Sequence, residues 1–194
     1  MDGQKSRKGR VVIISGPSGV GKSTICREAV KRLDNVCLSI SVTTRPRSRT
    51  EVDGRDYWFV TRQQFEERID KGLFLEHAEV FGNLYGTPKD KVDELLKKGK
   101  TVILEIDVQG GKQAKAVYKD AVTIFILPPS QKELAQRMNR RGRENTVTAK
   151  KRLGSADSEI AAARQYYEHN VINDDLEQAI NEVVKIIQQS IGEQ

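Results

Sequence analysis

Apolar and polar positions along this chain fall into short apolar runs that alternate with amphipathic segments. Apolar runs over residues 11–15, 37–40, 101–107 and 122–127 are expected to form strands, and a helical pattern over about 23–33 follows the first of them. Short apolar runs separated by helices are typical of a parallel sheet that helices cover on both faces. The pattern therefore predicts an α/β fold built on a parallel sheet.

Two further helices are predicted downstream. Ser130 and Glu133 have the spacing of a capping box directly after two prolines, and Leu134 and Met138 share one face of the helix that would follow. From about Leu176 onward, apolar residues recur at helical spacing, at positions 180, 183, 184, 187 and 191. We interpret this last apolar face as core packing rather than as a surface for a partner.

Residues 39–88 depart from this alternation. Segments 57–60 and 74–80 have the composition of strands, and Thr61 with Gln64 forms a capping-box pattern that opens a helix with Phe65 and Ile69 facing inward. Glycines at positions 54, 72, 82 and 86 indicate turns. We therefore expect a small inserted α+β lobe. Because ligands of open α/β sheets bind beyond the carboxyl ends of the strands, this lobe is expected to carry a second substrate site.

The segment GPSGVGKST matches the phosphate-loop pattern G-x-x-x-x-G-K-[ST]. Glycines let backbone N–H groups converge on phosphate oxygens, and the following helix N-terminus favours an anion. Lys22 would reach the β- and γ-phosphates, and the Ser23 hydroxyl would bind Mg²⁺. Because strand, loop and helix come in this order, we favour an ATP site over a glycine-rich turn that binds nothing. The residues expected to contact ATP here are Gly16, Pro17, Ser18, Gly19, Val20, Gly21, Lys22, Ser23 and Thr24.

Two acidic residues end the apolar run at 101–107. In phosphate-loop folds, an acid at the end of a neighbouring strand holds the metal, directly or through water, opposite the loop serine. Asp107 is the main candidate for this role beside Ser23, and Glu105 is expected one alternation away on the same face. The alternative is an acidic strand end that simply meets solvent.

The expected lobe carries side chains that suit a nucleoside monophosphate. Guanidinium groups and phenolic hydroxyls donate hydrogen bonds to a phosphate monoester, and arginine can do so bidentately. A carboxylate such as Glu76 accepts from two adjacent N–H groups, which guanine offers and adenine does not. A lobe whose charges are merely solvated is the alternative. The candidate residues are Arg45, Arg47, Arg49, Tyr57, Glu76, Tyr85 and Thr87.

Composition narrows the class of protein. A chain of 194 residues with 37% hydrophobic and 31% charged residues suits one globular unit, and no apolar run approaches the roughly 20 residues of a membrane helix. The first ten residues lack the apolar segment of a secretory leader, so we expect a cytoplasmic protein with no membrane partner. Residues 1–9 are expected to form a basic, disordered tail. Cys26 and Cys37 are expected to stay reduced.

The net charge of +6 would also suit a nucleic-acid partner. However, the basic residues cluster at 45–55 and 137–152, with few aromatic residues between them to stack on bases. We therefore favour an anionic small substrate and expect no nucleic acid. The oligomeric state stays open.

Several motifs together resemble those of guanylate kinases over nearly the whole chain. The shared segments are GPSGVGKST, SVTTRPR, EVDGRDYWFV, FLEHAEVFGNLYGTP, ILEIDVQG, ILPPS, RRGRE, KRL and VINDDLEQA. The resemblance implies one phosphate-loop NTPase domain over residues 10–194. This domain would comprise a core of 10–38, 89–129 and 154–194, a GMP-binding lobe of 39–88 and a helical lid of 130–153.

The implied reaction is transfer of a phosphoryl group from ATP to GMP, and to dGMP as well, with Mg²⁺. A kinase of another nucleoside monophosphate is one alternative. A catalytically inactive protein-binding module is the other, because guanylate-kinase-like domains also serve in that role.

The resemblance also assigns roles to single positions. The positions that match GMP-binding ones are Ser41, Arg45, Tyr57, Glu76, Tyr85 and Thr87, with Glu105 and Asp107 nearby. Asn173 matches a position beside the adenine of ATP. Phosphoryl transfer needs in-line alignment and compensation of spreading negative charge. The expected charge carriers are Lys22, Arg45 and the lid residues Arg141 and Arg152.

Two stretches depart from the family pattern. The lid has RGRE where RGTE is common, so Arg143 stands where a threonine often does. The lobe has R-P-R-S-R where the family usually has R-x-P-R, so either Arg47 or Arg49 must be the second phosphate arginine. Because Pro46 fixes its own φ and biases Arg45 toward an extended conformation, we expect the Pro-Arg pair to keep its place, and we predict Arg47.

Overall fold

The computed structural model describes residues 9–80, 82–140, 160–161 and 165–192. Its larger sheet has five parallel strands in the order β2-β7-β1-β8-β9. They are β1 (Arg10–Ser15), β2 (Val36–Leu38), β7 (Thr101–Glu105), β8 (Val122–Leu127) and β9 (His169–Ile172). In the register of this sheet, Ile13 pairs with Leu104 on one side and with Thr123 on the other. The predicted α/β fold with a parallel sheet is confirmed.

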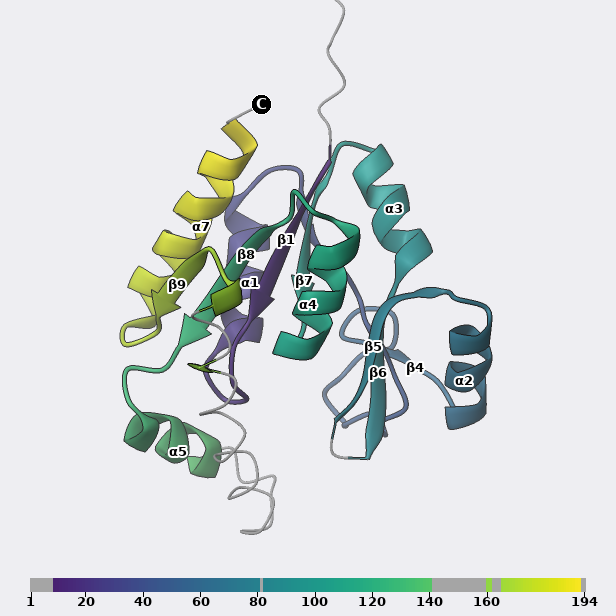
Figure 1. Cartoon of the computed structure of the whole chain (residues 1–194). Coiled ribbons are helices and arrows are strands. Elements are labelled where there is room, and N and C mark those ends of the chain that lie inside the picture. Colours follow the sequence, from purple (N-terminus) through teal and green to yellow (C-terminus); the bar gives the residue numbers. More distant parts are fainter. Residues whose placement is uncertain (1–8, 81, 141–159, 162–164, 193–194) are drawn as a thin grey trace, which may run out of the picture.

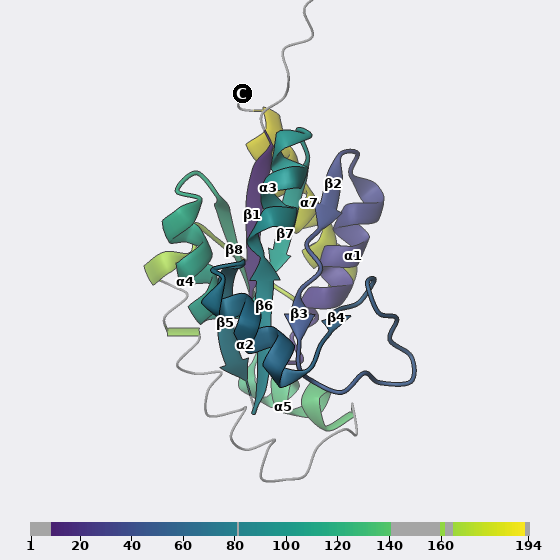
Figure 2. The same cartoon turned by 90° about the vertical axis from the view of Figure 1, so that its right-hand side faces the viewer.

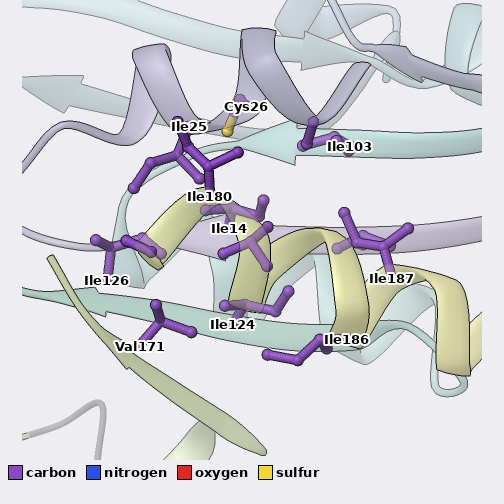
Figure 3. Close-up of a cluster of buried hydrophobic side chains, with 14 of the residues drawn as sticks. Ile14, Ile25, Cys26, Ile103, Ile124, Ile126, Val171, Ile180, Ile186 and Ile187 are labelled. Atoms are coloured by element: carbon purple, nitrogen blue, oxygen red, sulfur yellow. The ribbon is translucent and has the colours of Figure 1, made fainter. Parts of the chain in front are cut away.

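Helices cover both faces of the larger sheet. α1 (Lys22–Arg32) and α7 (Leu176–Gly192) pack on one face, and α3 (Lys89–Lys97) and α4 (Val108–Val117) pack on the other (Figure 1). Successive side chains of β1 serve the two layers in turn. Val12 and Ile14 contribute to the first layer, and Val11 and Ile13 to the second. In the first layer, Ile180 of α7 lies over the sheet (Figure 3), and burying one such side chain contributes roughly 1.5–3 kcal/mol.

Residues 42–88 contain a second, smaller sheet with the strand order β4-β3-β6-β5 (Figure 2). Its elements are β3 (Val42–Thr43), β4 (Trp58–Phe59), α2 (Arg62–Asp70), β5 (Phe74–Val80) and β6 (Asn83–Pro88). β6 pairs antiparallel with β5 and with β3, whereas β3 pairs parallel with β4. Phe65 of α2 is fully buried with Val42 and Leu84, so the smaller sheet has an apolar core of its own.

Several predicted local features are confirmed. β5 has the predicted bounds. Thr61 and Gln64 form the predicted capping box, because Thr61 Oγ1 accepts from Gln64 N at 3.2 Å while Gln64 Oε1 accepts from Thr61 N at 2.9 Å. α5 (Gln131–Arg140) follows Ser130, whose Oγ accepts from Glu133 N at 3.1 Å. The predicted helix from Leu176 is α7, and its apolar face is core.

Other predicted boundaries were wrong. The second strand ends at Leu38 and not at residue 40, because the chain turns there toward the smaller sheet. Of segment 57–60, only Trp58 and Phe59 form a strand. The strand predicted over 101–107 ends at Glu105, because Asp107 is the N-cap of α4. The sequence patterns also missed β3, α3, β6, α4 and β9.

The order of the strands determines where a ligand would bind. β1 lies between β7 and β8, so the loop after β1 opens at a point where successive connections leave in opposite directions. The smaller sheet and α5 both lie beyond this carboxyl edge (Figure 1).

Cys26 and Cys37 are free thiols, and burial raises the pKa of Cys26 well above its ordinary value. Among the described residues, no helix is long and apolar enough to cross a membrane.

Candidate active site

The loop between β1 and α1 has a backbone that excludes side chains at two positions. Gly16 has a φ of 151° and Gly21 a φ of 104°, both in the region that favours glycine. A Cβ on Gly16 would lie 2.5 Å from the carbonyl oxygen of Ile126, and one on Gly21 would lie 2.5 Å from Asn173 Nδ2. Glycine is therefore required at both positions, by the backbone conformation and by close packing against Ile126 and Asn173.

α1 begins at Lys22 with no side chain capping its first turn, since its N-cap is Gly21. The first N–H groups of a helix have no partner within the helix, and the helix dipole adds positive charge at this end. Lys22 Nζ donates to the carbonyl oxygens of Gly16 and Pro17, the latter at 3.2 Å. The ammonium group thus lies over the loop, so loop, helix end and lysine together form an anion site.

The two acids at the end of β7, Glu105 within the strand and Asp107 beyond it, have different partners. Ser23 Oγ donates to Glu105 Oε1 at 2.5 Å. Asp107 Oδ1 instead accepts from Gly110 N at 2.7 Å as the N-cap of α4. The expectation that both acids lie on one face of a strand was wrong, because Asp107 lies beyond the end of β7. In the described structure, the carboxylate that faces the loop serine belongs to Glu105.

A cavity of about 290 Å³ opens beside the loop. Its lining residues are Gly19, Val20, Gly21, Thr24, Arg137, Asn173, Asp174 and Leu176. Asn173 is 3% exposed and donates from Nδ2 to the carbonyl oxygen of Val20 at 2.7 Å. The backbone carbonyl oxygen of Asn173 accepts from Arg137 Nη1 at 2.9 Å. The family resemblance indicated Asn173 but not Arg137, which is partly buried in the structure and which no motif on α5 distinguishes from other helical arginines.

Glu76 of β5 is a buried carboxyl group at the inner side of the smaller sheet. It is 5% exposed, and its Oε1 accepts from the hydroxyl of Thr87, which is 1% exposed, at 2.5 Å. A Cβ on Gly110 would lie 2.6 Å from Glu76 Oε2, so this oxygen packs against the first turn of α4. Burial raises the pKa of Glu76 to about 7, and the nearby charge of Asp107 adds to the rise while Thr87 opposes it.

This carboxyl group lies close to the phosphate loop through a short chain of contacts. Gly110 N bonds to Asp107, and the carbonyl oxygen of Asp107 accepts from Ser15 Oγ at 3.3 Å. Ser15 directly precedes the loop, and its hydroxyl also accepts from Tyr167 Oη at 2.7 Å. The sequence patterns did not identify Ser15 or Tyr167. Their buried hydrogen bonds connect the loop to the start of α4.

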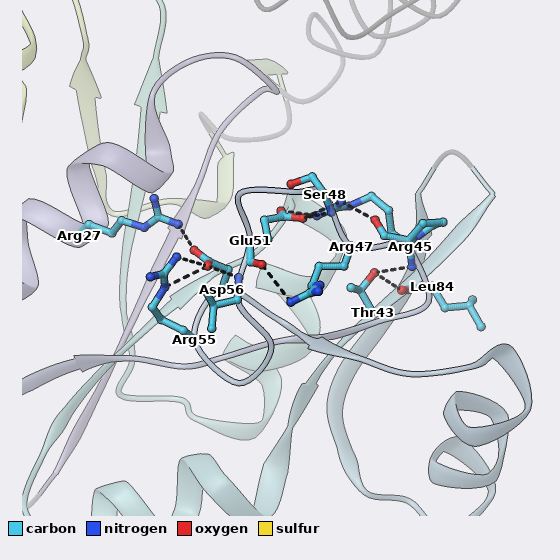
Figure 4. Close-up of polar contacts among 11 residues, drawn as sticks. Arg27, Thr43, Arg45, Arg47, Ser48, Glu51, Arg55, Asp56 and Leu84 are labelled. Carbon is cyan, nitrogen blue, oxygen red and sulfur yellow. Dashed lines mark hydrogen bonds and ion pairs between the residues drawn. The ribbon is translucent and has the colours of Figure 1, made fainter.

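Arg45 lies in the loop between β3 and β4 and is held on several sides (Figure 4). Its Nη2 and Nη1 donate to the two carboxylate oxygens of Glu51 at 2.7 and 3.1 Å. Its backbone N–H donates to Thr43 Oγ1 at 3.1 Å. The guanidinium carbon lies 5.4 Å from the centre of the Tyr57 ring, which in turn lies 6.1 Å from the Tyr85 ring in an edge-on arrangement. Arg45, Tyr57 and Tyr85 therefore converge as predicted for a phosphate site.

The other predicted lobe residues are less firmly held. Arg47 is exposed, and its Nη1 donates to the carbonyl oxygen of Glu51 at 3.4 Å (Figure 4). Arg49 is exposed as well. Ser41 lies just before β3, where its carbonyl oxygen accepts from Trp58 N at 2.9 Å. The choice between Arg47 and Arg49 therefore stays a prediction.

Two acidic residues of the EVDGRDY segment were missed. Glu51 binds Arg45 and also accepts from Ser48 N at 2.8 Å. Asp56 accepts from Arg27 of α1 at 2.7 Å, which joins the smaller sheet to the core. Both acids lie within a motif that the sequence patterns used only for its glycine and tyrosine. The sequence signal that could have indicated them is that acidic residues directly follow the arginine-rich stretch.

The predicted lid residues Arg141 and Arg152 lie outside the described residues, as does Arg143. The same holds for all but the last residue of the predicted disordered tail over 1–9. The cluster that the structure does describe comprises the phosphate loop, the Asn173 cavity and the Glu76 and Arg45 sites. These lie at the carboxyl edge of the larger sheet and in the smaller sheet beyond it.

Comparisons with known proteins agree with this geometry. The family model described as guanylate kinase matches residues 8–190. The chain is 47% identical over 180 residues to a guanylate kinase of Carboxydothermus hydrogenoformans, which covers 93% of this chain and 88% of that protein. It is 44% identical over 184 residues to a guanylate kinase of Synechocystis, covering 95% and 96%. A crystal structure of guanylate kinase from Anaplasma phagocytophilum is similar with a TM-score of 0.79 at 32% identity, covering 95% of this chain and 87% of that one.

Proposed function

Because this chain belongs to the guanylate kinase family, we propose that it transfers the γ-phosphoryl group of ATP to GMP, giving ADP and GDP. The observation that carries the choice of acceptor is the buried pair of Glu76 and Thr87 beside the first turn of α4. Guanine presents two adjacent donors, on N1 and on the 2-amino group, and a carboxylate accepts both. dGMP carries the same base and is proposed as a second acceptor.

ATP would bind by its phosphates in the loop 16–24 and by its adenine in the cavity beside Asn173. The open N-terminus of α1 and the ammonium group of Lys22 supply positive charge where the β- and γ-phosphates would lie. Lys22 would then exchange the loop carbonyls for phosphate oxygens. Arg137 lines the same cavity and is proposed as a further contact for the nucleoside.

GMP would bind between the smaller sheet and the end of β7. Glu76 and Thr87 would bind the base together with Ser41, and Arg45, Tyr57 and Tyr85 would bind the phosphate. Arg47 is proposed as an additional, exposed phosphate contact. The acids Glu105 and Asp107 would lie near the acceptor.

Mg²⁺ is the proposed cofactor, and the available donors fit it. Mg²⁺ prefers oxygen ligands and is usually held by one or two carboxylates together with substrate phosphates. Ser23 Oγ and Glu105 Oε1 lie 2.5 Å apart and supply such oxygens, while one oxygen of Asp107 remains beyond its cap bond to Gly110. Among the described residues, no cluster of three His, Cys, Asp or Glu forms a complete metal cage. The bound ion would neutralise phosphate charge.

The chain's own residues would promote the reaction by positioning and charge compensation. The transferred group spreads negative charge over its oxygens, so fixed cations near it stabilise the transition state. We assign this role to Lys22, Arg45, Arg141 and Arg152. Closure of the lobe and of a lid over 130–153 would exclude water and suppress hydrolysis of ATP. The reaction would take place in the cytoplasm, with no nucleic acid involved.

Release of ADP in the presence of different acceptors tests this proposal. We expect rapid release with GMP and dGMP and little with AMP, UMP or CMP. If another monophosphate gave the same rate of ADP release, GMP would not be the specific acceptor. No release with any of the five would favour the protein-binding module, against which the intact loop with Lys22 and Ser23 argues.

A further inference from the structure

Glu51 receives three hydrogen bonds in a loop that is otherwise largely exposed. Its carboxylate accepts from Arg45 Nη1, from Arg45 Nη2 and from Ser48 N, at 3.1, 2.7 and 2.8 Å. The side chain of Glu51 is 17% exposed although it lies outside every strand and helix. The Arg45 guanidinium lowers the pKa of Glu51 to about 2, so this carboxyl group is ionised throughout the neutral range. An ionised carboxylate with several fixed hydrogen bonds therefore lies within the loop between β3 and β4, residues 44–57, which we call the arginine loop.

Glu51 binds one particular edge of the guanidinium. A guanidinium has five N–H groups in a fixed plane. The two Nη atoms form the end edge, which Glu51 takes bidentately, and the second hydrogen of Nη1 goes to the carbonyl oxygen of Pro46 at 3.0 Å. The side edge of Arg45, formed by Nε and the remaining hydrogen of Nη2, takes part in none of these three hydrogen bonds. It can meet an anion bidentately, next to Tyr85, with which the guanidinium group also forms a hydrogen bond.

Two aromatic rings hold the plane of the same group. The guanidinium carbon of Arg45 lies 5.4 Å from the centre of the Tyr57 ring and 5.8 Å from that of Phe59. The backbone of Arg45 is fixed by Thr43 Oγ1, which is itself bonded to the carbonyl oxygen of Leu84 at 3.0 Å. The rings lie beside the guanidinium group, and Glu51 supplies the bidentate contact to its end edge, which Pro46 supports through Nη1.

We propose that Glu51 is a positioning residue for the acceptor phosphate, which it serves by holding the end edge of Arg45 so that the side edge faces the phosphate beside Tyr57. This inference rests on the proposed binding of GMP. It assigns Glu51 an effect opposite to that of its charge. A carboxylate that acted only through its negative charge would repel phosphate, whereas a positioning carboxylate strengthens phosphate binding.

The test compares the affinities of the full chain for GMP and for guanosine, which lacks the phosphate. The dissociation constant for guanosine divided by that for GMP measures how much the phosphate contributes to binding. Glu51→Gln keeps the size of the side chain but loses the ionic bidentate pair. We expect the ratio to fall about tenfold or more, since a hydrogen bond to a charged group is lost from its fixed geometry. Guanosine affinity and the Michaelis constant for ATP should stay within about twofold.

Glu79→Gln is the matched control. Glu79 also lies in the smaller sheet, is about half exposed and pairs with Arg62 at 3.4 Å, so the substitution removes the same charge without touching Arg45. It should leave the ratio unchanged. Glu51→Gln introduced into an Arg45→Ala background should have no further effect, because Glu51 acts through Arg45.

Three results would overturn the proposal. They are an unchanged ratio in Glu51→Gln, a raised ratio, or an equal loss of guanosine and GMP affinity. If Glu51→Gln did not fold, Glu51→Asp would keep the charge but shorten the reach by one methylene. It should lower the ratio selectively, and an unchanged ratio there would equally overturn the proposal. Failure of the proposed function is distinct, because the parent protein would then show no preference for GMP over AMP.

Discussion

The phosphate loop and the arginine loop both have the chemistry to bind phosphate, but they are built in opposite ways. The phosphate loop uses the backbone of nine consecutive residues, with Gly16 and Gly21 in conformations that favour glycine and the N-terminus of α1 supplying N–H groups. The arginine loop uses side chains from separate segments. Arg45, Glu51, Tyr57 and Tyr85 meet there only because the smaller sheet brings β3, β4 and β6 together.

The two regions also differ in how they treat charge. The phosphate loop presents positive charge near the surface, where Lys22 lies against carbonyl oxygens. The region around Glu76 buries an acid, and burial raises its pKa to about 7. A backbone site of this kind recognises phosphate and is indifferent to most of the rest of a ligand. In the proposed function, the buried acid paired with Thr87 would recognise the pattern of donors on one base.

Removing the lysine should produce the largest effect. We expect Lys22→Ala to lower turnover about 100–1,000-fold, which is the usual cost of losing one electrostatic donor to a transition state. The fold should persist, because Lys22 contacts loop carbonyls and not the apolar core. Steady-state kinetics with GMP and a thermal melt check both statements.

Lys31→Ala is the control for this substitution, since Lys31 lies on the same helix and pairs with Glu28 at the surface. It should keep parental turnover. Turnover of Lys22→Ala within a few-fold of the parent would remove Lys22 from the mechanism. It would also remove the contrast between the two regions.

Replacing the buried acid should affect the acceptor alone. Glu76→Gln places a donor amide where guanine needs an acceptor, and a lost bidentate base contact costs roughly 1–3 kcal/mol. The kcat/KM for GMP should therefore fall about 5- to 150-fold, with the Michaelis constant for ATP unchanged. Glu79→Gln on the same strand is exposed and should change neither value. If Glu76→Gln kept the kinetics and the preference over AMP, another group would be recognising the base.

The contrast also explains which parts of the site the sequence could predict. The phosphate loop can be predicted from its sequence motif alone, because its geometry depends on consecutive residues. The capping box at Thr61 and the bounds of β5 were predicted for the same reason. The partnership of Glu51 with Arg45 depends on how a loop closes on itself. No periodicity or spacing reports such a closure.

Packing accounts for two of the missed elements, β6 and α4. The turn predicted at Gly86 was wrong, because Gly86 lies within β6, where a Cβ would meet the Phe74 ring at 2.8 Å. α4 has Gly110 and Gly111 in its first turns, which disguises the helical pattern. Gly110 is required there because Glu76 packs against it. Both glycines serve contacts with residues distant in sequence, and single-segment patterns do not record these.

The raised pKa of Glu76 predicts a pH dependence of base binding. Guanine needs the ionised carboxylate, and the pKa of Glu76 in the free protein is about 7. The affinity for guanosine should therefore weaken as the pH falls below about 7, by up to tenfold for each unit, and should level off above it. Guanosine is the appropriate ligand, because the phosphate of GMP itself titrates near about pH 6.

The same pKa affects stability in the opposite direction. The folded pKa of Glu76 lies above the ordinary value of 4.5, so the folded state holds the proton more tightly than the unfolded state. The contribution of Glu76 to the free energy of unfolding therefore falls as the pH rises from about 4.5 to about 7. Glu76→Gln should flatten both profiles. A guanosine profile that kept its shape in this variant would mean that a different group titrates.

The smallest expected effect concerns the two exposed arginines and tests how far the arginine loop extends. Arg47 is predicted to be the second phosphate contact and Arg49 a solvated neighbour. Arg47 Nη1 now bonds to the carbonyl oxygen of Glu51 at 3.4 Å, within the same loop that holds Arg45. Because Arg47 is exposed, water screens its charge, and such pairs are typically worth about 0.2–1 kcal/mol. Arg47→Ala should raise the Michaelis constant for GMP about two- to fivefold and Arg49→Ala should leave it unchanged. A larger effect of Arg49→Ala would reverse the assignment, and equal effects would mean that both arginines reach the phosphate.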